Sequence, residues 1–122
     1  CSHSTVDVYN PKVIQSTMGS ICRVKVHYRN LEDILSTYHK KPNFVIYGSF
    51  LKGKNIYETE LAGKGLLVIG NESHGISTEL VPYIHHRLYI PDYSGKYGHR
   101  PESLNASVAA GIICAEFRRR TG

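Results

Sequence analysis

The sequence predicts an α/β fold in which helices cover both faces of a mainly parallel β-sheet. Two short apolar runs, residues 43–47 and 65–69, are flanked by residues that interrupt regular structure, as is typical of central strands buried on both faces. Strand-like and helix-like segments also alternate along the chain, which favours parallel strands joined by helical crossovers. In such folds, ligands bind at the carboxyl ends of the strands.

The first forty residues contain two strand-like and two helix-like segments. Residues 5–9 alternate as a short strand, and an Asn-Pro pair then predicts a helix over about residues 12–17. Residues 22–26 alternate again, which predicts a strand with one buried face. Asn30 has the position of a helix cap, with an acidic residue at the third helical position, and predicts a helix to about Lys40.

The later elements follow from similar local signals. The polar stretch between the two central strands is predicted to connect them, and it carries Lys52, Lys54 and Lys64. Three further elements are predicted: a short helix from a capping Ser77 or Thr78 through about Tyr83, a strand over residues 87–90, and a terminal helix over residues 105–120.

Length and composition predict a single domain, residues 1–122. With 41% hydrophobic residues, the chain can bury roughly two thirds of its unfolded surface. It has no apolar run near the roughly 20 residues needed to span a bilayer, and its start lacks the pattern of a signal peptide, so we expect a soluble, cytoplasmic protein. A net charge of +5 and a pI of 9.2 favour a polyanionic partner, with nucleic acid as the leading candidate.

Cysteine and histidine spacing favours neither a disulfide framework nor a metal site. Cys1, Cys22 and Cys114 are scattered and form no C-x-x-C pair, so we expect buried or idle thiols. No two histidines have helical i, i+4 spacing beside a carboxylate ligand. We therefore predict that the protein holds no metal.

The first candidate for a ligand site is the loop after the second central strand. Gly70 follows the strand and Gly75 closes a turn, so backbone could approach a ligand where a side chain would collide. The polar residues between them, Glu72 included, would be exposed. Taken alone, this pattern also fits a plain strand-to-helix connection. It is not a P-loop, because the Lys-Ser/Thr pair is absent.

The second candidate lies at the start of the terminal helix. Gly111 sits inside this helix at a cost of about 1 kcal/mol relative to alanine, which suggests that the helix packs closely against another backbone. The apolar residues predicted to share one face are Leu104, Val108, Ile112 and Ala115. Ser103 and Asn105 would stand at the helix N-terminus, either as ordinary caps or as contacts for a ligand that accepts hydrogen bonds.

Three ordered segments carry a resemblance to a known family: residues 13–26, residues 67–75, and residues 90–91 leading to 103–112. In order and spacing they resemble the SpoU/TrmH branch of the SPOUT RNA methyltransferases. The resemblance implies a C-terminal trefoil knot, S-adenosylmethionine as cofactor, methyl transfer to a ribose 2′-hydroxyl of tRNA or rRNA, and a homodimer.

The resemblance also assigns residues to the site. Gly70, Ile90 and Leu104 match the family's cofactor-contacting positions, and Met18 and Gly19 match a further segment that lines the pocket. The polar positions of the catalytic site are matched by Glu72, Ser103 and Asn105. These three would orient the ribose, and none of them is an obvious base for the hydroxyl proton.

Two departures from the family qualify this assignment. Family members begin with a further strand and helix that carry an Asn and a catalytic Arg, so we expect an N-terminally truncated domain that keeps the cofactor pocket but has little activity alone. A non-catalytic SPOUT-like module that binds RNA or a partner is the alternative. The loop over residues 92–102 is long for the family, and its Lys96 and Arg100 form either an RNA-contacting lid or a solvated surface.

The three arginines at the end of the chain, Arg118, Arg119 and Arg120, leave two interpretations open. They end the terminal helix, where positive charge favours the negative end of the helix dipole. RNA contact is the alternative.

Overall fold

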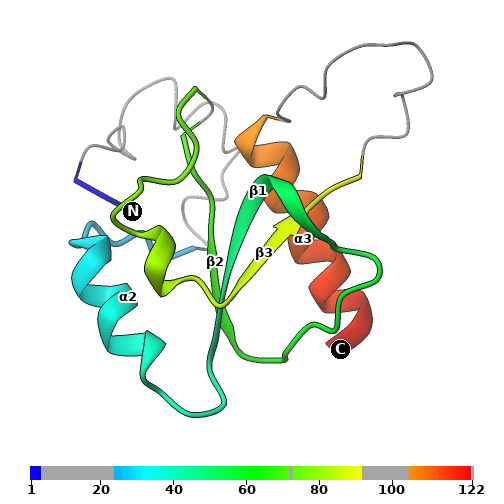
Figure 1. Ribbon diagram of the computed structural model, residues 1–122, viewed down its shortest axis with the longest axis horizontal. Coiled ribbons are helices and arrows are strands. Elements are labelled where there is room, and N and C mark those ends of the chain that lie inside the picture. Colours follow the sequence, from blue (N-terminus) through cyan, green and yellow to red (C-terminus); the bar gives the residue numbers. More distant parts are fainter. Residues whose placement is uncertain (4–23, 72, 92–104, 122) are drawn as a thin grey trace. The chain divides into compact units, whose positions relative to one another are not determined.

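The computed structural model describes residues 1–3, 24–71, 73–91 and 105–121, in two compact units, Cys1–Ile34 and Leu35–Gly122. The elements in this part of the chain are α2 (Leu31–His39), β1 (Val45–Asn55), β2 (Gly65–Val68), the 3₁₀ helix η2 (Val81–Tyr83), β3 (His86–Tyr89) and α3 (Ala106–Thr121) (Figure 1). The strand predicted over residues 5–9 and the helix predicted over residues 12–17 lie outside it.

The three strands form one parallel sheet in the order β2-β1-β3. Gly48 on the central strand β1 pairs with Val68 of β2 on one side and with Arg87 of β3 on the other. The predicted α/β fold with a parallel sheet is confirmed. All three strands point to the same edge of the sheet, which we call the carboxyl edge.

One face of the sheet packs against α3 around a buried tyrosine. Tyr47 is 2% exposed, and its ring meets that of Phe117 edge to face, with 5.0 Å between the ring centres. Its hydroxyl oxygen accepts a hydrogen bond of 2.8 Å from the backbone N–H of Ala62. The buried cluster consists of Tyr47, Ile56, Leu61, Leu88 and Ile113. Burial of these side chains holds α3 on the sheet.

The other face of the sheet is contacted by the end of α2. His39 donates a hydrogen bond of 2.9 Å from Nδ1 to the carbonyl of Tyr83, and its ring stacks on that of His85 at 4.5 Å. His85 in turn accepts a hydrogen bond of 2.9 Å at Nδ1 from the backbone N–H of Ile46. Since an accepting ring nitrogen carries no proton, neutral His85 bears its proton on Nε2.

The helix caps predicted at Asn30 and Asn105 are confirmed. Asn30 accepts a hydrogen bond at Oδ1 from the backbone N–H of Asp33, at 3.2 Å, and α2 begins directly after it. Asn105 likewise caps α3, because its Oδ1 accepts a hydrogen bond from the backbone N–H of Ser107. Neither cap depends on tertiary contacts, because the asparagine oxygen meets N–H groups that the helix itself leaves unpaired.

Two of the shorter predicted elements differ in the structure. Residues 24–26 form no strand, and Val24 is 63% exposed, so no buried face sustains the alternation predicted for residues 22–26. The helix predicted from Ser77 or Thr78 is only the single turn η2, whose N-cap is Leu80 and which has no side-chain cap. Proline in its first turn lacks the N–H needed to extend a preceding helical turn.

The strand β1 is longer than the sequence predicts, because it includes residues expected to connect two strands. Ser49 and Lys54 both pair with Leu88 of β3, so residues 50–53 of β1 interrupt the regular pairing between the two strands; we call these residues the β1 excursion. A methyl group on Gly53 would lie 2.6 Å from the carbonyl oxygen of Arg87. The excursion therefore closes directly over the backbone of β3.

The buried side of α3 is not the predicted one. Ala109, Ile113 and Glu116 are buried, whereas Val108 is 50% exposed and Ala115 is also exposed. Gly111 has open space beside it, so the close backbone packing expected there is absent among the described residues. The contacts of α3 with Tyr47 and with the segment after β1 set this rotation of the helix, and neither partner is adjacent to it in sequence.

The terminal arginines have a role that neither sequence interpretation anticipated. Arg119 donates hydrogen bonds to the buried Glu116 carboxylate at 3.1 and 2.6 Å, and Arg120 donates to it at 2.7 Å. The Arg120 guanidinium also donates to the backbone carbonyls of Tyr57 and Thr59. Glu116 and Arg120 thus join α3 to the segment that follows β1.

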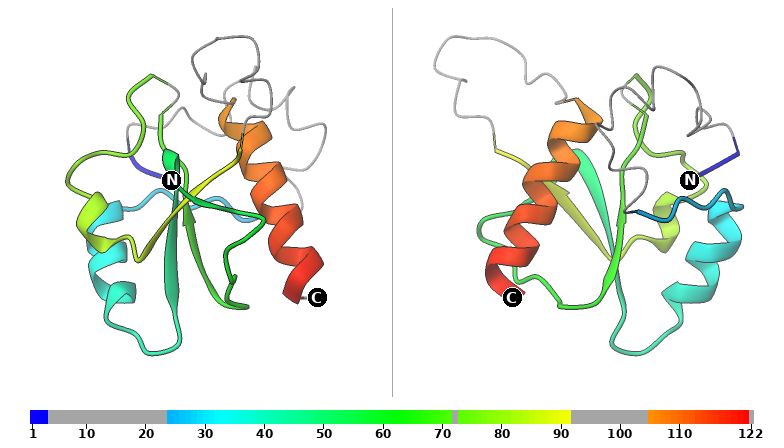
Figure 2. Two further views of the ribbon diagram at one scale, coloured as in Figure 1. Left: turned by 45° about the vertical axis from the view of Figure 1, so that its right-hand side comes forward. Right: turned by 180° about the vertical axis from the view of Figure 1, so that it is seen from behind.

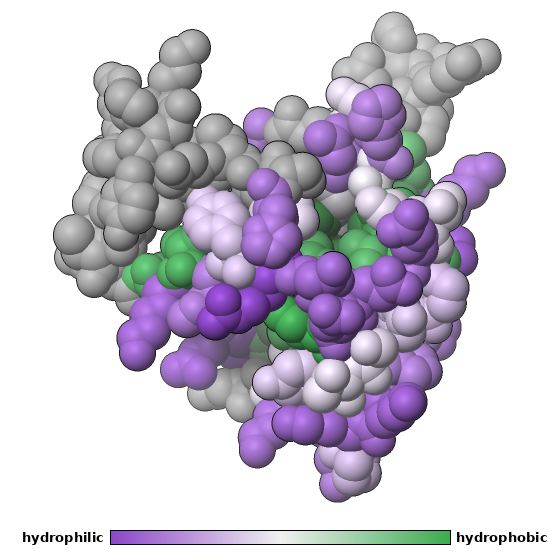
Figure 3. Space-filling model, turned by 90° about the vertical axis from the view of Figure 1, so that its left-hand side faces the viewer, coloured by the Kyte–Doolittle hydropathy of each residue, from purple (hydrophilic) through white to green (hydrophobic). Residues whose placement is uncertain are grey.

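The surface carries few large apolar areas on the side shown in Figure 3, where polar residues dominate and apolar ones appear between them. Cys1 and Cys114 are exposed free thiols, so of the two expected states, buried or idle, burial does not apply to these two. No helix in the described ranges is long and apolar enough to cross a membrane. These ranges also contain no group of three or more His, Cys, Asp or Glu residues placed to hold a metal ion.

The start of β2 provides a test of the strand register. A methyl group at Gly65 would overlap the Val45 carbonyl oxygen, whereas one at Gly63 would meet nothing within 4 Å. Gly65→Ala is expected to lower the free energy of unfolding by about 1–3 kcal/mol, because backbone must shift to admit the methyl group. The matched control Gly63→Ala should change it by no more than about 0.5 kcal/mol. Urea denaturation measures both, and equal effects would contradict the register.

The ion pairs of Glu116 with Arg119 and Arg120, which we call the α3 anchor, can be tested by changing the pH. Hydrogen bonds from Arg119, together with those from Arg120, outweigh burial and lower the pKa of Glu116 from 4.5 to about 2. A lowered pKa means that this contribution to stability is complete above pH 4.5 and is lost as the pH falls towards 2. Thermal unfolding should therefore show Glu116→Gln to be less stable than the parent chain at neutral pH, with the difference shrinking in acid.

The exposed Glu79 is the control position for this anchor, since it belongs to neither ion pair found among the described residues. Glu79→Gln is expected to leave the unfolding temperature nearly unchanged at neutral pH. If the difference in unfolding temperature between Glu116→Gln and the parent chain stayed constant from neutral to acidic pH, the α3 anchor would be contradicted.

Candidate functional site

The carboxyl edge brings together two of the predicted cofactor contacts. Val68 of β2 and Arg87 of β3 both pair with Gly48; Gly70 lies two residues beyond Val68, and Ile90 lies three residues beyond Arg87. The central strand β1 separates them, so they stand two strand spacings apart, roughly 10 Å. Ile69 and Ile90 both pack against the cluster around Tyr47, which fixes the ends of the two outer strands.

The turn after Gly70 is formed by its own hydrogen bonds. The N–H of Asn71 donates to the carbonyl of Gly75 at 3.0 Å, and the N–H of Gly75 donates to the carbonyl of Asn71 at 2.8 Å. The Asn71 side-chain oxygen accepts from the N–H groups of Ser73, at 2.7 Å, and His74, at 3.3 Å. Asn71 therefore organises the turn from both its backbone and its side chain, a role of Asn in tight turns.

The two glycines of this turn have different physical roles. Gly75 has φ of 69°, in the left-handed region that glycine adopts without strain. A methyl group on Gly70 would collide with the backbone of Gly75 and Ile76, so the space beside Gly70 is filled by the turn itself. Gly70 therefore allows the turn to close, and its approach to a ligand stays a prediction.

The N-terminal end of α3 lies at the same edge of the sheet. Figures 1 and 2 show this end of the helix beside the edge to which the strands point. Asn105 accepts hydrogen bonds at Oδ1 from the backbone N–H and the hydroxyl of Ser107, at 2.9 and 2.5 Å. Because its oxygen serves the cap, Asn105 would contact a ligand through its NH₂ group. The N–H groups of the first helical turn add positive potential there.

The remaining predicted site residues lie outside the described part of the chain. They are Met18, Gly19, Glu72, Lys96, Arg100, Ser103 and Leu104. The structure thus brings Gly70, Ile90 and Asn105 to one edge and leaves the other assignments as predictions.

A pair of residues that the sequence patterns did not single out lies on the opposite face of the sheet from α3. The Arg87 guanidinium stands over the ring of Phe50, 4.8 Å from its centre. Because side chains alternate along a strand, the sequence could have predicted that Arg87 faces away from Leu88. It could not have predicted the contact with Phe50, which is remote in sequence. The neighbouring His86 is a poor anion ligand at neutral pH, because partial burial, Lys54 and His85 lower its pKa.

A shallow cleft of about 350 Å³ lies elsewhere, at the end of β1. Its lining residues are Lys54, Asn55, Glu58, Thr59 and Glu60. It contains none of the predicted site residues, and its mixed charges favour neither an anionic nor a cationic ligand. The carboxyl edge is therefore the better candidate for chemistry.

Relatives of known description agree with this geometry. Residues 1–115 match the model of the SpoU rRNA Methylase family. The chain is 31% identical over 115 residues to the 23S rRNA (guanosine(2553)-2′-O)-methyltransferase RlmP of Bacillus subtilis, covering 93% of this chain and 44% of that protein. It is 35% identical over 83 residues to the tRNA (guanosine(18)-2′-O)-methyltransferase of Aquifex aeolicus, covering 66% and 37% respectively.

Solved structures give the same result for the fold. A TrmH-family protein from Porphyromonas gingivalis superposes with a TM-score of 0.84 at 37% identity, over 98% of this chain and 47% of that one. The SpoU methyltransferase AviRb from Streptomyces viridochromogenes, in complex with AdoMet, superposes with a TM-score of 0.80 at 25% identity, over 100% and 49%. The chain spans less than half the length of each of these proteins. Ordered motifs, parallel sheet and family match agree, and the chain belongs to the SpoU rRNA methylase family.

Proposed function

We propose that this chain forms most of the catalytic domain of a cytoplasmic methyltransferase that uses S-adenosylmethionine to methylate a ribose 2′-hydroxyl of tRNA or rRNA. The observation that carries the proposal is the meeting of Gly70, Ile90 and the N-terminal end of α3 at the carboxyl edge, beside a preformed turn. The names of the RlmP and Aquifex relatives support the reaction, and those relatives also act on rRNA and tRNA respectively.

The cofactor would lie across the carboxyl edge. Gly70, Ile90 and Leu104 are the proposed contacts, with Met18 and Gly19 lining the same pocket. The described residues fit this ligand, since half-buried Ile90 offers an apolar surface for an adenine ring beside backbone groups that can bond its edge. When bound, S-adenosylmethionine supplies an electrophilic methyl group.

The polar residues of the site would orient the RNA. Glu72, Ser103 and Asn105 are proposed to position the ribose, and Asn105 would donate from its NH₂ group because its oxygen serves the helix cap. None of the three is suited to remove the hydroxyl proton, so that step needs a group from another part of the protein. We therefore expect the 122-residue chain to bind cofactor but to transfer methyl groups poorly alone.

One side of α3 suits contact with a second copy of the chain. The exposed side of α3 carries Val108, Gly111 and Ala115, at helical spacing, and nothing lies within 4 Å of a methyl group placed on Gly111. A slim, partly apolar helix face suits a second copy of the same chain, so we propose a homodimer through this side of α3. The trefoil knot of the family is proposed for the C-terminal part on the strength of the structural similarity.

A matched substitution at Asn105 tests the reaction. Asn105→Asp keeps the helix cap, because Asp and Asn cap equally well, but it removes the NH₂ donor. Isothermal titration should show similar cofactor binding for both forms. Transfer of labelled methyl groups to unmodified tRNA and rRNA by the longer protein should fall at least about tenfold in the variant.

The product identifies the acceptor atom. A 2′-O-methyl group blocks alkaline cleavage of the next phosphodiester, so labelled dinucleotides should survive hydrolysis. Label recovered only in mononucleotides would sink the proposed reaction, and cofactor binding without any transfer would favour the alternative of a non-catalytic RNA-binding module. Efficient transfer by the 122-residue chain alone would show that the missing group lies within it.

A charge on the open side of α3 tests the dimer. Val108→Glu is expected to convert the protein to a monomer in light scattering, because a carboxylate would be buried between the two copies. Leu51→Glu is the control, since Leu51 is 58% exposed but lies on β1. An unchanged mass for Val108→Glu, or equal dissociation by both variants, would refute this interface.

A further inference from the structure

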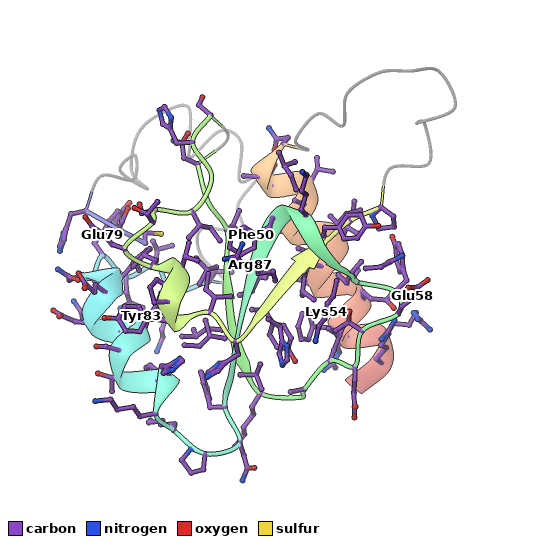
Figure 4. All side chains as sticks on the ribbon, in the orientation of Figure 1. Phe50, Lys54, Glu58, Glu79, Tyr83 and Arg87 are labelled. Atoms are coloured by element: carbon purple, nitrogen blue, oxygen red, sulfur yellow. The ribbon has the colours of Figure 1, made fainter. Side chains whose placement is uncertain are left out.

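Arg87 and Phe50 form a cation–π pair on the surface of the sheet. Figure 4 shows the two side chains together, one from β3 and one from β1. The guanidinium carbon lies 4.8 Å from the centre of the ring, a distance at which the ring face attracts the cation. Arg87 is nevertheless exposed, so the ring supports one side of the guanidinium and leaves its N–H groups open to solvent.

The backbone holds both partners in place. A methyl group on Gly48 would lie 2.7 Å from the Phe50 ring and 2.8 Å from the end of Ile84, so the ring occupies space that only glycine leaves open. Gly53, at the other end of the β1 excursion, closes against the Arg87 backbone. The excursion is therefore shaped around Arg87 and restricts the conformations of its side chain. Less conformational entropy is then lost when Arg87 binds a ligand.

The charge of Arg87 has no carboxylate partner in the described ranges. Both ion pairs found there belong to Glu116, on α3. The excursion adds Lys52, which is exposed, and Lys54, also exposed, follows where pairing with β3 resumes. Positive charge thus gathers around a fixed, planar guanidinium.

A guanidinium held in this way suits the oxygens of a phosphate. Its fork of N–H groups binds two phosphate oxygens at once, and stacking on a ring leaves that edge free. Arg87 lies three residues before Ile90 along β3, roughly 10 Å from the carboxyl edge. An RNA strand whose ribose is placed at this edge would carry its neighbouring phosphates past Arg87.

We propose that Arg87, supported by Phe50 and accompanied by Lys52, binds a backbone phosphate of the RNA close to the reacting nucleotide. This inference rests on the proposed function, because it requires an RNA substrate at the carboxyl edge. The contact reads no base, so it contributes to affinity and to the placement of the strand while sequence is read elsewhere.

The test compares two variants that each remove one positive charge. Fluorescence anisotropy with a labelled, unmodified tRNA transcript would be measured over a series of salt concentrations. Arg87→Gln is expected to weaken binding about fivefold at low salt and to reduce the slope of log K against log salt by about 0.7 to 0.9, the value for one lost phosphate contact. Lys64→Gln removes the same charge from an exposed position directly before β2, at the opposite end of that strand from the carboxyl edge, and should leave the slope unchanged.

A second variant isolates the role of the ring. Phe50→Leu keeps an apolar side chain in the space beside Gly48 but removes the aromatic face, so binding should weaken by about twofold while the salt slope is kept. Both Arg87→Gln and Phe50→Leu should bind S-adenosylmethionine with the affinity of the parent protein, because neither residue is among the proposed cofactor contacts.

The outcomes separate this inference from the proposed function. If the parent protein binds and methylates RNA but Arg87→Gln keeps the parent affinity and slope, the phosphate contact is wrong and the function stands. Equal losses in Arg87→Gln and Lys64→Gln would reveal only a general charge effect and would also overturn the contact. A parent protein that neither binds nor methylates RNA would remove the proposed function, and the contact with it.

Discussion

The burial of Tyr47 in the central strand is the constraint on which the second unit depends. Its ring meets Phe117 of α3, and its hydroxyl accepts a hydrogen bond from Ala62 in the segment between β1 and β2. One side chain thus fixes the sheet, the helix and a connection at once. Arg120 joins the same helix to the same connection through two carbonyls, so α3 is held at two points. Placement of α3 in turn sets where its N-terminal end meets the carboxyl edge.

Local signals in the sequence were sufficient for much of this fold. The apolar runs over residues 43–47 and 65–69 predict β1 and β2, because buried parallel strands are apolar on both faces. Asn30 and Asn105 predict the starts of α2 and α3, because a cap depends on its own helix. Each of these features is decided within a few residues, and a single sequence displays it directly.

Features set by distant partners could not be predicted in this way. The buried side of α3 depends on Tyr47 and on carbonyls some sixty residues away, so helical periodicity alone selected Val108 and Ala115. The excursion of β1 depends on pairing with β3, and a polar stretch with lysines reads as a connection until that partner is known. Among the candidate site residues, Gly70 is predicted from its glycine pattern, whereas no local pattern marks Arg87, because its aromatic partner lies on another strand.

The turn organised by Asn71 bears on how a ligand would be recognised. Its hydrogen bonds join Asn71 to Ser73, His74 and Gly75, so these residues already have their arrangement before anything binds. A loop that must order on binding loses conformational entropy, at about 0.5–1.5 kcal/mol for each side chain immobilised, and this loss weakens the complex. A preformed turn avoids most of that loss and also keeps its shape after a ligand leaves. Successive ligands would then meet the same surface, and selectivity would come from fit to a fixed shape more than from adjustment of the loop.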